Sequence, residues 1–205
     1  LTETNGVGAA ASGALFAYKP RSSGVVSPII DVRVADAMGQ PLPPGTQGEI
    51  WLRGVTVMSG YWRDAQATAA AMQADEGWFR TGDVGYLDDE GFLFIVDRIK
   101  DVINRCGEKI AAAEVESCLL QLPDVLEAAV FAVPDDDTGE AVVAVVSVRE
   151  GCGLDAQALQ AHVGAHLAAY KVPASIHVLT EALPRNPAGK LLKAQLRSTF
   201  VAARD

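Results

Sequence analysis

The sequence predicts an α+β protein, in which a small antiparallel β-barrel-like subdomain precedes a compact α+β domain with a sheet and flanking helices. Before residue 92, short apolar runs alternate with Pro/Gly turns, a pattern typical of hairpins. After residue 110, helical periodicity alternates with apolar strands. Between them an apolar run ends in the charged cluster Asp97-Arg98-Ile99-Lys100-Asp101. Because a charged break between two compositions is typical of a domain boundary, we expect one domain over 1–98 and another over 99–205.

The composition is that of a globular protein. Hydrophobic residues make up 49% of the 205 residues and charged residues 21%, enough for a packed core. The net charge of −9 argues against a nucleic-acid surface, which needs a basic stripe. Three cysteines without a CxxC pair indicate neither a disulfide framework nor a zinc site. With no apolar run of membrane length and no signal sequence in view, we expect a cytoplasmic protein.

The first part of the chain alternates strand-like runs with turns, since Pro and Gly supply the fixed and permissive φ values that turns require. Asp64 has the chemistry of a helix N-cap. The expected elements are a loop over 1–24, strands over 29–36 and 49–53, an extended segment over 54–62, a helix over 65–74 that Gly77 ends, and strands over 78–87 and 92–96 joined by a turn at 88–91.

Helix and strand patterns alternate in the second part. Val115, Cys118, Leu119 and Leu122 fall on one face of a helix. The nearly continuous apolar run over 141–148 is typical of a strand that is buried on both faces. The expected elements are helices over 112–122, 154–170 and 191–200 and strands over 125–133, 141–148 and 176–179.

Three short segments carry polar residues suited to a nucleotide. Thr2-Glu3-Thr4 offers hydroxyls for a phosphate and a carboxylate for Mg²⁺, although such pairs are common by chance. Asp83 is a carboxylate that can accept two hydrogen bonds from the vicinal hydroxyls of a ribose, or it is a turn aspartate. A Pro/Gly-rich loop over 183–190 ends in Lys190, which is either a point charge for developing negative charge or an exposed loop lysine. A fourth segment, Gly48–Trp62, indicates a strand with turn glycines.

The histidines offer a weaker signal. His162 and His166 are four residues apart on one predicted helix, a spacing that can hold a metal ion. The sequence shows no third ligand of that kind. We therefore expect His162, His166 and His177 to be surface residues.

Together and in this order, these segments resemble the adenylate-forming superfamily, which includes acyl-CoA synthetases and the adenylation domains of peptide synthetases. The resemblance covers residues 1–197. It implies a two-step ligase, an acyl-CoA synthetase that converts a carboxylic acid, fatty or related, and ATP-Mg²⁺ into an acyl-adenylate and then passes the acyl group to CoA with release of AMP. The matching stretches are LTET, GEIWLRGVTVMSGYW, WFRTGDVGYLDDEGFLFIVDRIKD, CGEKIAAAEVE and LPRNPAGKLLK.

The resemblance also implies roles by motif position. Cys106 departs from the pattern because many relatives have glycine there, and Ala111-Ala112-Ala113 replaces the more usual serine-proline. The implied roles are Thr2 at the α-phosphate, Glu3 on Mg²⁺, Asp83 and Arg98 at the ribose, Asp101 as a domain hinge, Cys106, Gly107 and Glu108 along the pantetheine path, and Lys190 as the catalytic lysine of adenylation.

We therefore expect the C-terminal portion of a longer CoA ligase. Residues 1–98 would be the last β subdomain of its large AMP-binding domain, and 99–205 its mobile C-terminal domain. The chain alone would be inactive, because the phosphate loop and acyl pocket belong upstream of Leu1. Expected partners are the acid, ATP and CoA, without nucleic acid, and a homo-oligomer is left open. Two alternatives also remain open: an adenylation domain that loads a carrier protein, and a non-catalytic module that binds a nucleotide or a protein.

Overall fold

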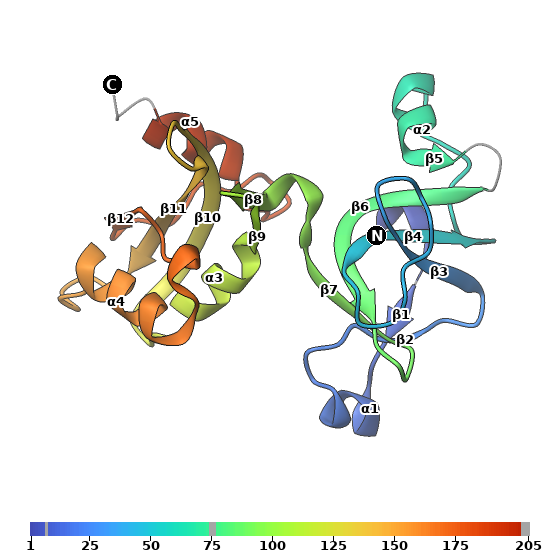
Figure 1. Ribbon diagram of the computed structural model, residues 1–205, viewed down its shortest axis with the longest axis horizontal. Helices are drawn as coiled ribbons and strands as arrows, with labels where there is room; N and C mark the ends of the chain where they lie inside the picture. Colours follow the sequence, from blue (N-terminus) through green and yellow to red (C-terminus); the bar gives the residue numbers. More distant parts are fainter. Residues whose placement is uncertain (7, 74–76, 202–205) are drawn as a thin grey trace. The chain divides into compact units, whose positions relative to one another are not determined.

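The chain divides into two compact units, Leu1–Lys100 and Asp101–Asp205. The computed structural model describes residues 1–6, 8–73 and 77–201. Figure 1 shows a curled antiparallel sheet in the first unit and a sheet flanked by helices in the second, so the α+β prediction is confirmed. The assignment of the first unit to a larger domain stays a prediction. None of the described helices is long and apolar enough to cross a membrane.

The sheet of the first unit is antiparallel throughout, in the order β1-β2-β7-β6-β4-β3, and β5 also pairs with β6. Its core holds Ile30, Ile50, Leu52 and Leu93. The predicted strands are confirmed. The strands are β1 (Ala9–Ala10), β2 (Gly24–Val26), β3 (Ile30–Ala35), β4 (Gly48–Gly54), β5 (Met72–Gln73), β6 (Trp78–Leu87) and β7 (Phe92–Arg98).

The helix after Asp64 is confirmed with its cap. It runs as α2 (Ala65–Ala71), and the Asp64 carboxylate accepts a hydrogen bond from the N–H of Ala67 at 2.8 Å. It ends before the predicted residue 74, because β5 pairs with β6 instead. Residue 74 itself lies outside the described residues.

Two predictions for this unit are wrong. Residues 1–24 are not merely a loop: they hold the 3-10 turn η1 (Thr2–Thr4), β1 and the short helix α1 (Gly13–Tyr18). Pairing of β1 with β2 orders this segment, and local periodicity does not reveal such a tertiary contact. The segment 54–62 is not extended, since the N–H of Val57 bonds to the carbonyl of Gly54 in a turn.

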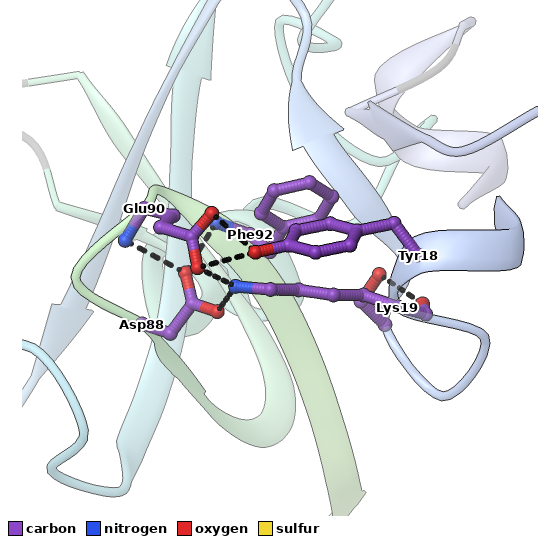
Figure 2. Close-up of polar contacts among 6 residues, drawn as sticks. Tyr18, Lys19, Asp88, Glu90 and Phe92 are labelled. Atoms are coloured by element: carbon purple, nitrogen blue, oxygen red, sulfur yellow. Dashed lines mark hydrogen bonds and ion pairs between the residues drawn. The ribbon is translucent and has the colours of Figure 1, made fainter. Parts of the chain in front are cut away.

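An ion cluster ties the N-terminal segment to the β6–β7 turn. Figure 2 shows the Lys19 ammonium held by the carboxylates of Asp88 and Glu90, beside the rings of Tyr18 and Phe92. The Lys19 Nζ atom lies 2.7 Å from Glu90 Oε1 and 4.5 Å from the centre of the Phe92 ring. The hydrogen bond from Lys19 is the main reason why the pKa of Asp88 lies below its usual value. The cluster therefore anchors the turn that joins the two strands.

The second unit follows the predicted order of helix, strand, strand, helix, strand, helix. Strand β10 pairs with β11 antiparallel, and β11 pairs with β12 parallel. A hairpin of β8 and β9 precedes them, where the sequence indicated only a polar turn. The short η2 (Ile99–Asp101) crosses the division between the units. The elements of the second unit are β8 (Val102–Arg105), β9 (Glu108–Ala111), α3 (Ala112–Leu119), β10 (Val125–Asp135), β11 (Gly139–Val148), α4 (Ala156–His166), η3 (Ala169–Lys171), β12 (Ser175–Leu179) and α5 (Lys193–Val201).

Strand β11 is buried on both faces, as its continuous apolar run predicts. One face contributes Val142, Ala144 and Val146 to a core that also holds α3 and α4 side chains. The other face contributes Val143 and Val145 to a second core with Leu196 of α5 and with Leu183. Helix α4 is shorter than the predicted 154–170, because the chain turns into η3 after His166.

Candidate functional site

Asp83 and Arg98 form a pair across two neighbouring strands. They lie opposite each other in the β6–β7 register, and Arg98 Nε is 3.1 Å from Asp83 Oδ1. Asp83 is buried, with 8% of its surface exposed, whereas the Arg98 side chain is half-exposed. Burial raises the pKa of Asp83, and the Arg98 charge offsets part of that rise. A buried carboxylate next to a half-exposed guanidinium can bind neutral hydroxyl donors.

The backbone around Asp83 is held by side chains of β4 and β6. Thr81 Oγ1 donates to the carbonyl of Ile50 at 2.7 Å and accepts from the N–H of Asp83 at 3.0 Å. The N–H of Gly82, whose φ is +70°, donates to Glu49 Oε1 at 3.2 Å. Because both neighbours are bonded to β4 directly, the Asp83 carboxylate has a defined position.

Gly85 lets β6 and β7 approach closely next to this site. A Cβ atom at residue 85 would lie 2.2 Å from the carbonyl oxygen of Phe94 and 2.7 Å from Cδ1 of Ile50. No side chain fits at that distance, so the second glycine in the sequence GDVG has a packing reason.

A cavity of about 150 Å³ opens beside Asp83. Its size is below that of typical ligand sites, about 300–1,000 Å³, so within this unit it admits only part of a nucleotide. Thr4 and Thr81 line it, and the sequence analysis did not single out Thr81. The lining residues are Leu1, Thr4, Gly8, Ala9, Ser23, Ile50, Leu52, Thr81, Asp83, Leu93 and Ile95.

The predicted phosphate and Mg²⁺ residues lie on η1, next to this cavity but outside its lining. Thr2 is exposed, and Glu3 is partly buried. Glu3 Oε1 accepts a hydrogen bond from the Tyr61 hydroxyl at 3.3 Å. Thr4 is the buried member of the segment, and its hydroxyl is bonded to the carbonyls of Leu1 and Gly6.

A tight hairpin in the second unit carries the next group of predicted residues. Arg105 pairs with Glu108, so Cys106 and Gly107 form a two-residue turn. Their φ angles are +52° and +87°, the values of a type I′ turn, which favours Asn-Gly or Gly-Gly. Cys106 therefore holds a backbone conformation that suits glycine better.

This hairpin borders a hollow of about 360 Å³. The N–H of Cys106 donates to the carbonyl of Thr138 at 2.9 Å, and Arg105 Nη1 donates to the carbonyl of Tyr170 at 2.8 Å. The hollow is lined by Arg105, Cys106, Glu108, Thr138, Ala169 and Tyr170. Two of the three residues predicted along the pantetheine path thus share one hollow, and Gly107 lies in the turn between them.

Lys190 stands at the end of a closed loop of the second unit. Asn186 Oδ1 accepts from the N–H groups of Ala188 at 3.0 Å and of Lys190 at 2.9 Å. Arg185 pairs with Leu191 in an isolated bridge. The Lys190 side chain is exposed, and within the described parts of the chain no carboxylate pairs with it. The loop therefore exposes the Lys190 ammonium group to solvent.

Glu127 of β10 fastens this loop to the sheet. Its Oε2 accepts from the N–H of Leu183 at 2.7 Å, and its Oε1 accepts from Arg185 Nε at 2.9 Å and Nη2 at 2.5 Å. Arg185 Nη1 also donates to the carbonyl of Gly189 at 2.6 Å. Burial would raise the pKa of Glu127, but these bonds from Leu183 and Arg185 outweigh it and lower the pKa. The sequence analysis missed Glu127, because nothing near it in the sequence indicates a partner 58 residues away.

Besides Thr2 and Glu3 on η1, the predicted residues thus lie at four separate places. Asp83 and Arg98 pair in the first unit, whereas Cys106 and Glu108 share a hollow of the second. Lys190 stands on its own loop, and Asp101 lies in η2 where the two units divide.

Comparison with known proteins places the chain in a family. Residues 1–62 match the family model for AMP-binding enzymes, and residues 114–190 match that for the C-terminal domain of AMP-binding enzymes. Among curated relatives, feruloyl-CoA synthase of an Amycolatopsis species is 44% identical over 184 residues, which are 90% of this chain and 37% of that protein. A 2-succinylbenzoate–CoA ligase of Geobacillus kaustophilus is 46% identical over 159 residues, 78% of this chain and 32% of that protein.

Solved structures similar to this chain point to the same family as the sequence comparisons. The o-succinylbenzoate CoA synthetase of Bacillus subtilis, in complex with its acyl-adenylate intermediate, has a TM-score of 0.89 and 38% identity over 96% of this chain and 40% of that one. The amide bond synthetase of Marinactinospora thermotolerans has a TM-score of 0.80 and 40% identity, over 88% of this chain and 36% of that one. The chain belongs to the adenylate-forming superfamily of AMP-binding enzymes. It corresponds to the C-terminal portion of these relatives and spans between 32% and 40% of their length.

Proposed function

We propose that this chain is part of an ATP-dependent acyl-CoA ligase of the AMP-forming class. The observation that carries the proposal is the Asp83–Arg98 pair, a buried carboxylate held at 3.1 Å from a half-exposed guanidinium beside a cavity. It occurs in a chain whose relatives are named CoA ligases. The expected cytoplasmic location and homo-oligomer stay predictions.

The proposed reaction has two balanced steps. In the first, an oxygen of the carboxylic acid attacks the α-phosphorus of ATP, and the bond to pyrophosphate breaks to give acyl-AMP. In the second, the CoA thiol loses its proton and attacks the acyl carbon, so that AMP leaves and a thioester forms. The acid that we propose is a fatty or related acid, and the names of two relatives add feruloyl and 2-succinylbenzoate groups as candidates.

In the first unit, Asp83 would accept hydrogen bonds from the ribose hydroxyls, with Arg98 holding the carboxylate in place. Thr2 would contact the α-phosphate. Glu3 fits Mg²⁺, because the Tyr61 hydroxyl bonds to its Oε1 atom, and Mg²⁺ is commonly bound by one or two carboxylates plus substrate phosphates. A solved relative carries both ATP and magnesium.

In the second unit, Lys190 would stabilise the negative charge that develops on the α-phosphate and the attacking carboxylate. Two unit charges about 4 Å apart interact by roughly 4 kcal/mol at an intermediate dielectric, against about 1 in water. Cys106, Gly107 and Glu108 would line the pantetheine path of the second step. Lys190 and the Cys106 turn belong to separate segments of one unit, so Asp101 would act as the hinge that presents each in turn.

The longer protein tests the proposal through its separate half-reactions. Lys190→Ala should abolish acyl-adenylate formation, measured by pyrophosphate exchange, and largely spare thioester formation from supplied acyl-adenylate. Arg197→Ala, which removes an exposed charge on α5, should leave both intact. If both half-reactions survive Lys190→Ala, the lysine assignment is wrong. The 205-residue chain alone should show no pyrophosphate exchange.

A nucleotide variant checks the first unit separately. Asp83→Asn keeps the size of the side chain and removes its charge. Hydrogen bonds to charged groups are worth about 1.5–3 kcal/mol, so KM for ATP should rise roughly 10- to 150-fold. An unchanged KM would contradict the ribose assignment.

One relative supports a second candidate acceptor. Because an amide bond synthetase is 40% identical, the acyl-adenylate of this enzyme could instead pass to an amine. An acceptor panel of CoA and primary amines, each with the same acids, separates the two: thioester formation supports the ligase, and amide formation without thioester supports the amine acceptor.

A further inference from the structure

Two histidines and a cysteine meet between α3 and α4, a cluster that the proposed ligase reaction does not use. Ligand atoms of Cys118, His162 and His166 all lie within 4.8 Å of one another. The sequence analysis expected surface histidines because no third ligand was in view. The fold supplies one, since α3 packs against α4 and brings residue 118 next to residue 162.

Both imidazole rings are already oriented by backbone carbonyls. His162 Nε2 lies 3.0 Å from the carbonyl oxygen of Cys118, and His166 Nδ1 lies 2.8 Å from the carbonyl oxygen of His162. A carbonyl only accepts, so each of these nitrogens carries the proton. The other nitrogen of each neutral ring then has a free lone pair. Metal-binding histidines typically donate their second N–H in this way, which fixes the tautomer.

The cysteine is buried, whereas the histidines lead outward. Cys118 is 2% exposed in the core beneath α3, His162 is partly buried, and His166 is exposed. Burial, with a smaller contribution from Glu114, raises the pKa of the Cys118 thiol. Without a cation, Cys118 is therefore a neutral core thiol. Of the three residues, His166 is therefore the one that solvent reaches most easily.

We propose that Cys118, His162 and His166 form a zinc site that joins α3 to α4. The ligand set of one thiolate and two imidazoles is typical of Zn²⁺ and leaves a fourth, tetrahedral position for water. This inference is independent of the ligase proposal, because it concerns different residues and a resident cation rather than a substrate.

The geometry needs only a small adjustment. With Zn–S near about 2.3 Å and Zn–N near about 2.0–2.1 Å, tetrahedral ligand atoms stand about 3.3–3.6 Å apart. The ligand atoms lie within 4.8 Å of one another, so the widest separation has to contract by at most about 1.2–1.5 Å. On binding, the Cys118 S–H bond breaks, the thiolate binds Zn²⁺, and the proton passes to water.

Cobalt substitution tests the site in the 205-residue chain. The chain is stripped with a chelator and titrated with Co²⁺. A thiolate-to-cobalt charge-transfer band with intense visible bands, saturating at one Co²⁺ per chain and displaced by Zn²⁺, is expected. Zn²⁺ should also raise the midpoint of thermal unfolding.

Two variants make the result specific. Cys118→Ala should remove the charge-transfer band, and the exposed His166→Gln, which cannot disturb the core, should weaken Co²⁺ binding at least 10- to 100-fold, because loss of an outer partner alone costs about that much. Cys152→Ala and His177→Gln are matched controls that should bind Co²⁺ as the parent chain does. Absence of the band in the parent chain, or equal binding by His166→Gln, would overturn the proposal and leave Cys118 as a core thiol.

Discussion

Replacing Glu127 by glutamine should loosen the loop that presents Lys190. The substitution keeps the side-chain size but turns one acceptor oxygen into a donor, so either the N–H of Leu183 or the Arg185 guanidinium loses its partner. The carboxylate is mostly buried, whereas the Arg185 side chain is 45% exposed. A hydrogen bond to a buried charged group is worth about 1.5–3 kcal/mol, and a solvent-screened pair only about 0–1 kcal/mol.

We therefore expect a local loss of about 1–2 kcal/mol, which makes opening of the loop roughly 5- to 30-fold more frequent. Hydrogen exchange on the 205-residue chain measures this directly at the amides of Gly189, Lys190 and Leu192, which are bonded within the loop. Amides of the β8–β9 hairpin serve as an internal reference. Glu150→Gln, at an exposed position, is the matched control. Unchanged exchange at the three loop amides would refute the view that Glu127 fastens the loop.

The pH dependence gives the same test a second arm. Glu127 has a pKa below its usual value of 4.5, so its contribution is fully present above that value and is lost as pH falls through the lowered folded-state pKa. Loop protection, corrected for intrinsic exchange, should fall in that acid range in the parent chain. In Glu127→Gln it should show no such loss.

Three further predictions concern stability. Cys106→Asn should raise the free energy of unfolding of the second unit by about 0.5–1 kcal/mol, and Cys106→Val should lower it by about 1–2 kcal/mol. Asparagine tolerates the left-handed backbone at this position, whereas a β-branched residue does not. Urea unfolding followed by circular dichroism measures both variants, and the opposite order of stability would refute the turn assignment. Gly85→Ala should lower the free energy of unfolding of the first unit by about 1–3 kcal/mol, because the added Cβ atom would meet the Phe94 carbonyl. Tryptophan fluorescence follows the urea unfolding of this unit, since all tryptophans precede residue 100. An unchanged urea midpoint would contradict the close packing at Gly85. The ion pair that lowers the pKa of Asp88 stabilises the fold fully above the usual pKa of 3.8, and this stabilisation is lost as pH falls through the lowered folded-state pKa. Lys19→Met should therefore weaken the dependence of the urea midpoint on acidic pH. An identical pH profile in the variant would exclude the ion pair.

Local signals predicted most of the elements. The capping chemistry of Asp64 predicted a helix after it, and the structure contains α2 with Asp64 as its N-cap. The apolar run over 141–148 predicted a strand buried on both faces, because a strand with one face in solvent alternates apolar and polar residues. In both cases the cause lies within a few residues of the feature.

Contacts between residues that are far apart in the sequence were not predicted from it. The order in residues 1–24 comes from strand pairing and from Lys19 binding Asp88, 69 residues away. Glu127 reaches Arg185 over 58 residues, and Cys118 meets His162 over 44. Such contacts depend on how elements pack, and neither periodicity nor capping chemistry encodes a partner at that separation.

The two apolar faces of β11 have a consequence for alignment. A strand with one polar face resists a one-residue shift in register, because the shift would bury polar groups. Strand β11 has no polar face, so this penalty does not apply to it. We infer that the connection between β10 and β11 helps to set their alignment, because Thr138 bonds there through its N–H and hydroxyl to the Asp135 carboxylate at 2.9 and 2.7 Å. The Thr138 carbonyl in turn receives the N–H of Cys106. The Asp135–Thr138 connection thus helps to fix the register of the second unit. A change in register there would displace both Glu127 beneath the lysine loop and the Cys106 turn.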